Sequence, residues 1–173
     1  PESSVKIPVK ILPPESSLGG TYQSMITFDY RDYLGQDRVD TLTIGLAVRG
    51  FVDIKLTGIF VRPDPAVAGE ELTVSGIVYN GGIVPARTVN VTALAEHPFK
   101  AKLGYSTIIG DVPKDGQSSF SITIGVLDVD PGTYTLKILI TYRDDRNNIE
   151  NETFNIPIDV VKPTVTTERP LSE

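Results

Sequence analysis

The chain of 173 residues carries 16 lysines and arginines against 22 aspartates and glutamates, a formal net charge of −6 at pH 7. Nucleic-acid binding needs a basic face, so this balance argues against a nucleic-acid partner. The sequence has no cysteine, which excludes disulfides and thiolate metal sites.

Period-two alternation of apolar and polar residues runs along most of the chain, and no stretch shows a helical period. In residues 1–50 this alternation predicts three strands, over residues 5–11, 22–30 and 40–48. Pro8 lies in the first of these strands, and Pro157 lies in a predicted strand near the end of the chain. Because proline cannot donate to a sheet ladder, we expect both strands to be edges or bulges there.

Residues 51–163 contain seven further runs separated by turn residues, over residues 54–60, 72–78, 89–95, 103–109, 120–126, 134–142 and 154–160. Asn80-Gly81-Gly82 ends the second run, and we expect positive φ there because asparagine and glycine tolerate it. Seven short strands in a unit of about 110 residues predict an all-β fold, a two-sheet antiparallel sandwich. We expect Ile138 in its core and Leu139 on the opposite face. Residues 164–173 are rich in proline and threonine and predict an extended linker.

Two parts of the chain share one pattern at a constant offset. Gly20-x-Tyr22-x-x-x-Ile26-x-Phe28-x-Tyr30-Arg31-Asp32 returns as Gly132-x-Tyr134-x-x-x-Ile138-x-Ile140-x-Tyr142-Arg143-Asp144, and Leu42, Ile44, Leu46 and Val48 match Phe154, Ile156, Ile158 and Val160. Upstream, Ser3-Ser4-Val5-x-Ile7-x-Val9-x-Ile11 matches Ser118-Ser119-Phe120-x-Ile122-x-Ile124-x-Val126 at a slightly longer offset. So long a period indicates an array of whole domains. We expect residues 1–50 to be the C-terminal half of one unit and residues 51–163 to be a complete unit.

Candidate catalytic and metal sites are few. His97 is the single histidine, and a Ser-His-Asp triad would need it. No nucleophile elbow accompanies it, so we expect a solvated loop residue, no enzyme activity and no cofactor. Asp128 with Asp130, and Asp144 with Asp145, offer oxygens to Ca²⁺, but neither pair fits a calcium-loop pattern. We expect these aspartates to form turns, and the sequence predicts no metal site.

Other polar motifs point to the surface. Asn90-Val91-Thr92 and Asn151-Glu152-Thr153 are N-glycosylation sequons, which makes Asn90 and Asn151 candidate glycosylation sites. Tyr22, Tyr30, Tyr134 and Tyr142 share the phase of the apolar residues, which favours core packing over sugar stacking. The repeated Arg31-Asp32 and Arg143-Asp144 pairs are interpreted as hairpin electrostatics of small energetic value.

Several segments of the complete unit follow one another in a family-like order. They are the opening strand over 54–61, Pro63, Gly69-Glu70-Glu71-Leu72-Thr73-Val74, Val78-Tyr79-Asn80-Gly81-Gly82, Ala86-x-x-Val89-x-Val91, Asp115-Gly116-Gln117-Ser118-Ser119-Phe120 and Gly132-Thr133-Tyr134. In this order the unit resembles cell-adhesion-related (CARDB-type) domains and archaeal S-layer-like repeat domains. The resemblance implies an immunoglobulin-like β-sandwich in tandem repeats of extracellular prokaryotic proteins, without catalytic residues. The Tyr-Arg-Asp hairpin is more like the archaeal branch.

Together these features predict a non-catalytic structural or adhesive repeat of a larger extracellular, cell-surface protein. Its expected partners are neighbouring repeats and other surface proteins, and membrane attachment is expected only through residues outside this sequence. The alternative is a carbohydrate- or polymer-binding accessory module of a secreted hydrolase, which needs an exposed aromatic patch or a polar groove. For residues 1–50 we also expect an uncovered apolar face and a homodimer formed through it.

Overall fold

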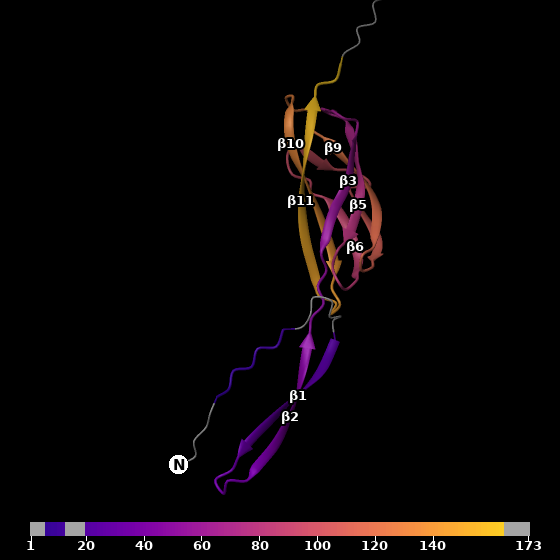
Figure 1. Cartoon of the computed structure of the whole chain (residues 1–173). Coiled ribbons are helices and arrows are strands. Elements are labelled where there is room, and N and C mark those ends of the chain that lie inside the picture. The colour runs from indigo at the N-terminus through magenta and orange to yellow at the C-terminus, as the bar shows by residue number, and fades with distance from the viewer. Residues whose placement is uncertain (1–5, 13–19, 165–173) are drawn as a thin grey trace, which may run out of the picture. The chain divides into compact units, whose positions relative to one another are not determined.

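The computed structural model describes residues 6–12 and 20–164, and in these ranges the protein is all-β, with strands, turns and no helix. No helix capable of crossing a bilayer occurs in them. The chain forms two compact units, Pro1–Gly50 and Phe51–Glu173, called unit 1 and unit 2 below (Figure 1).

Unit 2 is built from two sheets. The first has the order β3-β5-β9-β7, comprising β3 (Ile54–Arg62), β5 (Glu71–Asn80), β9 (Gln117–Val126) and β7 (Phe99–Ala101). The second has the order β4-β11-β10-β6-β8, comprising β4 (Ala66–Val67), β11 (Ile149–Val161), β10 (Gly132–Arg143), β6 (Ala86–Ala93) and β8 (Ser106–Val112). Neighbouring strands are antiparallel except β4 and β11, which are parallel.

One apolar core lies between the two sheets, because alternate side chains of each strand face inward. From the first sheet come residues such as Val74, Ile122 and Ile124, and from the second come Val91 and Ile138, all at most 1% exposed. The predicted phase of β10 is confirmed: Ile138 is fully buried, whereas Lys137 on the other face pairs with Glu96 at 2.8 Å. The sheets therefore form a sandwich held together by apolar packing.

The seven runs predicted in unit 2 correspond to the seven longer strands, and the structure adds the short strands β4 and β7. The fourth run, predicted over 103–109, is β8 at Ser106–Val112. The alternation over 54–60 predicts that Phe60 shares the inward face with Ile54 and Leu56, and this phase is wrong in the second half of β3. A bulge between Thr57 and Phe60, with Gly58 at φ 58°, turns Phe60 outward and brings Ile59 and Val61 against the core.

The turn after β5 also differs from its prediction. None of Asn80, Gly81 and Gly82 is at positive φ. Gly82 is required instead by close approach, since a Cβ there would lie 2.7 Å from the backbone nitrogen of Asp53. The turn is tied to the start of unit 2, because Gly81 donates to the Asp53 carbonyl at 2.8 Å and Ile83 donates to the Phe51 carbonyl at 3.0 Å.

Unit 1 contains one hairpin, formed by β1 (Gly20–Arg31) and β2 (Asp37–Val48). The two strands predicted over 22–30 and 40–48 are present. The third, predicted over 5–11, is absent from residues 6–12, and Val5 lies outside the described residues. No neighbouring strand pairs with this segment in the described part of the chain, so its backbone gains no ladder to hold it extended. The linker predicted over 164–173 lies outside the description beyond residue 164.

Pro157 lies where the sequence predicts a sheet edge. Its Cα pairs with Thr135 of β10 on one side, and β4 reaches β11 only at Val160 and Val161. β11 is therefore an edge strand at Pro157, and the missing N–H of the proline costs no ladder bond there. Pro8 falls in the segment without a strand, so the edge predicted there does not exist.

Candidate functional site

The most informative surface of the molecule is the hairpin of unit 1, because unit 2 contains the same hairpin in a covered state. In unit 1 the Cα pairing runs from Gly20↔Val48 to Arg31↔Asp37. In unit 2 it runs from Gly132↔Val160 to Arg143↔Ile149, which is the same register at the constant offset of the sequence repeat. The repeat found in the sequence is thus a repeat of strand pairing.

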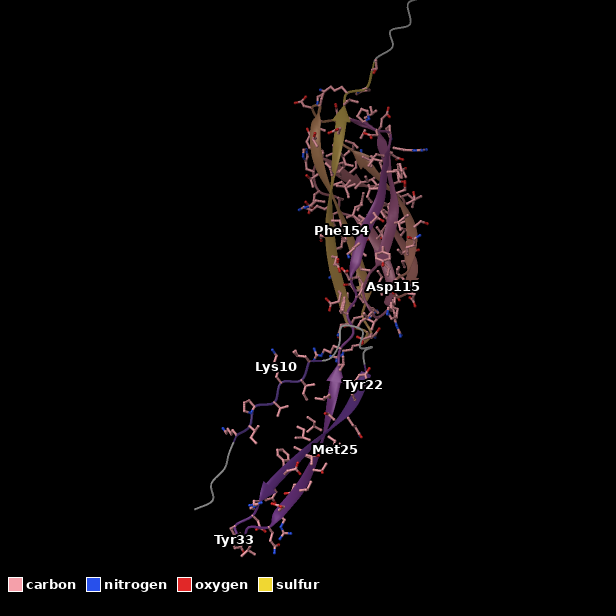
Figure 2. All side chains as sticks on the ribbon, in the orientation of Figure 1. Lys10, Tyr22, Met25, Tyr33, Asp115 and Phe154 are labelled. Atoms are coloured by element: carbon pink, nitrogen blue, oxygen red, sulfur yellow. The ribbon has the colours of Figure 1, made fainter. Side chains whose placement is uncertain are left out.

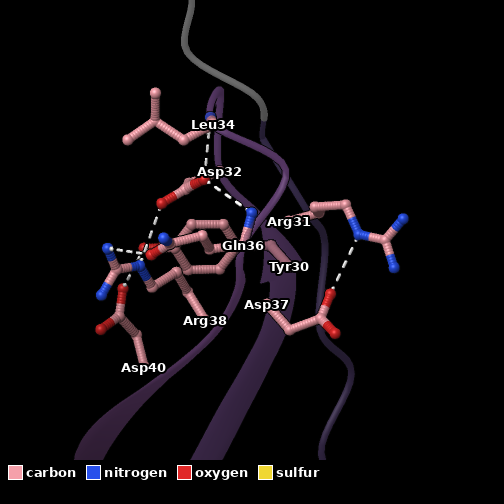
Figure 3. Close-up of polar contacts among 8 residues, drawn as sticks. All are labelled: Tyr30, Arg31, Asp32, Leu34, Gln36, Asp37, Arg38 and Asp40. Atoms are coloured by element: carbon pink, nitrogen blue, oxygen red, sulfur yellow. Dashed lines mark hydrogen bonds and ion pairs between the residues drawn. The ribbon is translucent and has the colours of Figure 1, made fainter.

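The loops that close the two hairpins use the same hydrogen bonds. In unit 1 the carboxylate of Asp32 accepts from the backbone N–H groups of Leu34 and Gln36, each at 2.9 Å (Figure 3). In unit 2 the carboxylate of Asp144 accepts from those of Arg146 and Asn148, at 2.9 and 2.8 Å. These are the Asx-type contacts by which a short acidic side chain organises a turn.

Those contacts lower the pKa of both carboxyl groups. For Asp32 the backbone N–H of Gln36 is the main cause, and for Asp144 it is the side-chain amide of Asn148. Hydrogen bonds donated to a carboxylate favour its charged form. Asp144 is therefore occupied in holding its own turn, the role that the sequence interpretation favoured over calcium binding.

A tyrosine and an acid recur on one face of each hairpin. Tyr30 donates to the Asp40 carboxylate at 2.9 Å, and Tyr142 donates to that of Glu152 at 3.0 Å. The two acids are separated by the same offset as the two tyrosines. Tyrosines were selected from the sequence, but their acidic partners were missed, although the offset would have found them.

The apolar residues of the two hairpins lie in different environments. In unit 2 the inward face is buried or nearly so and includes Ile138, Ile140, Tyr142, Ile156, Ile158 and Val160. The equivalent residues of unit 1, called the hairpin face below, are Ile26, Phe28, Tyr30, Ile44, Leu46 and Val48. On this face Phe28 is 37% exposed and Tyr30 is 48% exposed, against 0% for Ile140 and 6% for Tyr142. The other four residues of the hairpin face are half-buried, so the face that is closed in unit 2 is only partly covered in unit 1.

The other two tyrosines selected from the sequence, Tyr22 and Tyr134, lie in different environments. Tyr134 is half-buried against the core of unit 2, and its hydroxyl donates to the Asp130 carbonyl at 2.8 Å. Tyr22 is 44% exposed on unit 1 (Figure 2). Core packing therefore describes the two tyrosines of unit 2, whereas the two of unit 1 are exposed in the same sequence positions.

The arginine and the aspartate of each repeated Arg-Asp dipeptide contact other residues and not each other. Arg31 contacts Asp37 at 3.0 Å and Asp32 contacts Arg38 at 3.1 Å (Figure 3). Arg143 donates to the Asn147 carbonyl at 3.0 Å. Each contact stays within its hairpin end. Exposed pairs of this kind contribute at most about 1 kcal/mol.

The acidic residues selected as candidate calcium ligands are spread over two places. Asp128 and Asp130 lie before β10, where Asp130 pairs with Lys162 at 3.3 Å. Asp145 is exposed beside Asp144 in the β10–β11 loop. Across residues 6–12 and 20–164, no three histidine, aspartate or glutamate side chains are placed to share a metal ion.

Chelation is accordingly expected to leave the protein unchanged. EDTA should not alter the melting temperature measured by circular dichroism, because hydrogen bonds to Asp144 organise one acidic loop and Asp130 of the other pairs with Lys162. A rise of several degrees on adding millimolar Ca²⁺ would contradict this and assign a site to the Asp128/Asp130 or the Asp144/Asp145 cluster.

His97 and the two sequons lie at the surface or near it. His97 is exposed in the turn between β6 and β7. Asn90 is half-buried on β6, where it donates to Thr92 at 3.2 Å and accepts from the Ser106 hydroxyl at 3.0 Å. Asn151 is exposed on β11 and accepts from Thr141 at 2.8 Å. Asn151 is the more accessible of the two to a glycosylating enzyme.

A hollow of about 410 Å³ opens at the side of unit 2 between β3 and β11. Its lining includes the outward-turned Phe60 and the carboxylates of Asp64 and Asp159. The carbohydrate-binding alternative needs an exposed aromatic patch or a polar groove, and this hollow supplies one aromatic ring and two aspartates. The sequence interpretation missed this hollow, because the bulge at Gly58 decides where Phe60 points.

The burial of Tyr142 makes the stability of unit 2 depend on pH in the alkaline range. Burial, and then the hydrogen bond to Glu152, raise the pKa of Tyr142 well above its ordinary value of 10.0. Because the pKa of Tyr142 is raised in the folded state, the buried neutral tyrosine contributes fully to the free energy of unfolding below the unfolded pKa of about 10. That contribution is lost as the pH rises beyond this value.

We therefore expect the free energy of unfolding to fall more steeply between about pH 10 and pH 12 in the wild type than in Tyr142→Phe. Denaturant titrations at successive pH values measure both slopes. Tyr33, which is 94% exposed in the β1–β2 loop, supplies the matched control Tyr33→Phe, expected to keep the wild-type slope. Equal slopes for all three proteins would contradict the prediction.

Comparisons with known proteins identify no family: no protein-family model and no curated protein sequence matches the chain. Among solved structures, the chain is similar to the major pilin subunit BcpA of Bacillus cereus, with a TM-score of 0.42 and 10% identity over 87% of this chain and 66% of that one. It is also similar to domains 4 and 5 of the S-layer protein SbsC, with a TM-score of 0.31 and 17% identity over 83% and 66%. Beta-glucosidase 3B from Thermotoga neapolitana matches with a TM-score of 0.27 and 16% identity, over 67% of this chain and 18% of its own.

The chain spans about two thirds of the pilin and S-layer chains that it matches. All three TM-scores lie below 0.5, so these similarities do not decide what the chain does.

Proposed function

We propose that this chain is a non-catalytic structural or adhesive module of a larger prokaryotic, archaeal-type cell-surface protein, in which immunoglobulin-like units follow one another. The observation that carries the proposal is the recurrence of one hairpin, with the same register and the same loop contacts, in both units. Repetition of a folded unit is how extended surface proteins gain length and present repeated contacts.

The strand order of unit 2 supports the immunoglobulin-like assignment. β3, β5, β9 and β7 face β11, β10, β6 and β8 across one core, and the short β4 joins the second sheet beside β11. An opening segment whose two strands join different sheets, here β3 and β4, followed by this Greek-key order, is typical of immunoglobulin-like sandwiches. The order of segments that resembles CARDB-type and archaeal S-layer-like repeats falls on these same strands.

On this proposal, unit 2 positions its neighbours, and exposed surfaces such as the hairpin face and the sheet edges make the contacts. Partners are other repeats of the same protein and other surface proteins. Asn151 is the sequon we expect to carry a glycan, because its side chain is exposed. The pilin and S-layer similarities agree with a surface location without supplying the argument for it.

Surface labelling tests the location. An antibody raised against residues 51–164 should label intact cells of the source organism in immunogold microscopy, with an antibody to a cytosolic protein as the negative control. Labelling that appears only after permeabilisation would contradict the proposal.

The hollow beside Phe60 favours one second candidate, the carbohydrate- or polymer-binding accessory module. Retention of the protein on an insoluble polysaccharide such as cellulose, chitin or murein, lost in Phe60→Ala and kept in the exposed Leu103→Ala, would support this candidate. Absence of retention on all three would leave it without support.

A further inference from the structure

The hairpin face of unit 1 has a visible counterpart in unit 2, and that counterpart shows what covers it. In unit 2 the equivalent residues pack against the inward face of the β3-β5-β9-β7 sheet, where Val74 and Val78 of β5 and Ile122 and Ile124 of β9 are buried. The free edge of β10 pairs with β6. The β10–β11 hairpin is therefore contacted on two sides in unit 2: the opposite sheet packs on its apolar face, and β6 pairs with its first strand, β10.

One strand of this cover has an equivalent within unit 1. Residues 3–11 repeat the pattern of 118–126, which is nearly all of β9 and in which Phe120, Ile122, Ile124 and Val126 face the core. Ile7 and Val9, the equivalents of Ile122 and Ile124, are instead 64% and 58% exposed. The connection to the hairpin is residues 12–19 in place of 127–131, so it is somewhat longer and its length allows the same placement.

In unit 2 the strand β9 is held by β5, with Cα pairs from Glu71↔Gly125 to Tyr79↔Gln117. Among the described residues of unit 1 nothing corresponds to β5, and residues 6–12 form no strand. A strand without a hydrogen-bonded neighbour leaves its backbone groups to water. The absent β5-like neighbour thus accounts for both exposed surfaces, the hairpin face and the segment 6–12.

We infer that the hairpin face is a docking site for one kind of occupant, the part of this same repeat that supplies strands like β3 and β5 of one sheet and a strand like β6 of the other. On docking, residues 6–11 become the β9-like strand of the completed unit. The β5-like strand pairs with residues 6–11, the β6-like strand pairs with the free edge of β1, and the hairpin face is buried as in unit 2. The inference rests on the repeat that underlies the proposed function. Its test measures the protection of strands from hydrogen exchange, whereas surface labelling measures the location of the protein. The inference and the proposed function can therefore fail separately.

The test supplies the inferred occupant from the chain's own sequence. A copy of residues 51–116 is joined directly in front of Glu2 of the full chain, which places it as residues 51–116 stand before Gln117 in unit 2. Hydrogen exchange followed by mass spectrometry is measured at low micromolar concentration on peptides from β1, β2 and residues 6–12, in the fused and the original chain. We expect exchange at least about tenfold slower in all three segments of the fused chain, since burial and pairing protect backbone amides.

Two variants of the fused chain form a matched pair on β1. Ile26→Asp places a charge on the hairpin face and should abolish the added protection. Met25→Asp places the same charge on the opposite face, where Met25 is 70% exposed, and should leave it intact (Figure 2). Peptides from β10 and β11 report that unit 2 is folded in every sample.

Unchanged exchange of the hairpin in the fused chain would overturn the inference. The inference would also be overturned if the strands of the added copy stayed unprotected, because the same sequence folds on the equivalent hairpin in unit 2. Protection that Ile26→Asp fails to remove, or that appears only as a concentration-dependent dimer forms, would overturn it as well. The dimer result would make a second copy the occupant.

Discussion

Truncating Ile138 to alanine is expected to destabilise unit 2 by about 2–5 kcal/mol. Ile138 is fully buried at the centre of β10, pairs with Phe154 of β11 and with Ala93 of β6, and faces the opposite sheet across the core. Removing its methylene and methyl groups loses their transfer free energy and leaves a cavity between the two sheets. The cavity cannot close easily, because β10 is held by β11 on one side and by β6 on the other.

Denaturant unfolding of the full chain measures the loss, with the midpoint lowered and the slope with denaturant unchanged. Leu139→Ala is the matched control, because Leu139 lies next along the same strand on the other face and is half-exposed. Its cost should be well below that of Ile138→Ala. Equal costs for the two variants would show that the strand does not face the core as described.

Replacing Asn80 by alanine is expected to cost about 3–5 kcal/mol, because several buried groups lose their partners together. The side chain of Asn80 is fully buried. Its amide nitrogen donates to the carbonyls of Val84 and Val112 at 2.9 and 3.2 Å. Its oxygen accepts from the backbone N–H groups of Gly82 and Asp53 at 2.9 and 3.2 Å. One side chain thus joins the ends of β5 and β8 to the first residues of unit 2.

At roughly 3–5 °C per kcal/mol, between the values for smaller and larger domains, the melting temperature of Asn80→Ala should fall by about 10 °C or more. Asn80→Asp should be at least as unstable, because a carboxylate cannot donate to the two carbonyls and adds a buried charge. The exposed Asn155→Ala is the control and should stay within about 0.5 kcal/mol of the wild type. A melting temperature of Asn80→Ala close to that of the control would contradict the role described.

Alternation of apolar and polar residues predicted the seven longer strands of unit 2 and the two strands of the hairpin. It succeeded there because these strands bury one face, so the sequence records which residues point inward. It missed β4 and β7, since strands of two and three residues are too short to show a period. It also assigned Phe60 to the wrong face, because a bulge at a single glycine reverses the phase that follows.

The candidate surface could be predicted only in part. The constant offset between the two copies identified the second hairpin and its apolar residues, and it would have identified Asp40 and Glu152 had acids been compared as well. The strand predicted over 5–11 failed because a strand depends on its neighbour, which a single segment does not encode. Asn80 was interpreted as a turn former through φ, whereas its four hydrogen bonds join residues from 53 to 112.

Light scattering on the 173-residue chain and on a chain beginning at Phe51 tests the central claim, that unit 1 carries an uncovered sandwich face, most directly. Unit 2 has a complete core of its own, so we expect the shorter chain to be monomeric. Among the described residues of the longer chain no second sheet covers the hairpin face, so we expect this chain to dimerise through that face in a concentration-dependent way, because exposed strand surfaces favour association. Ile26→Asp should restore the monomer, and Met25→Asp should not. A longer chain that remains monomeric with its hairpin ordered would contradict the account.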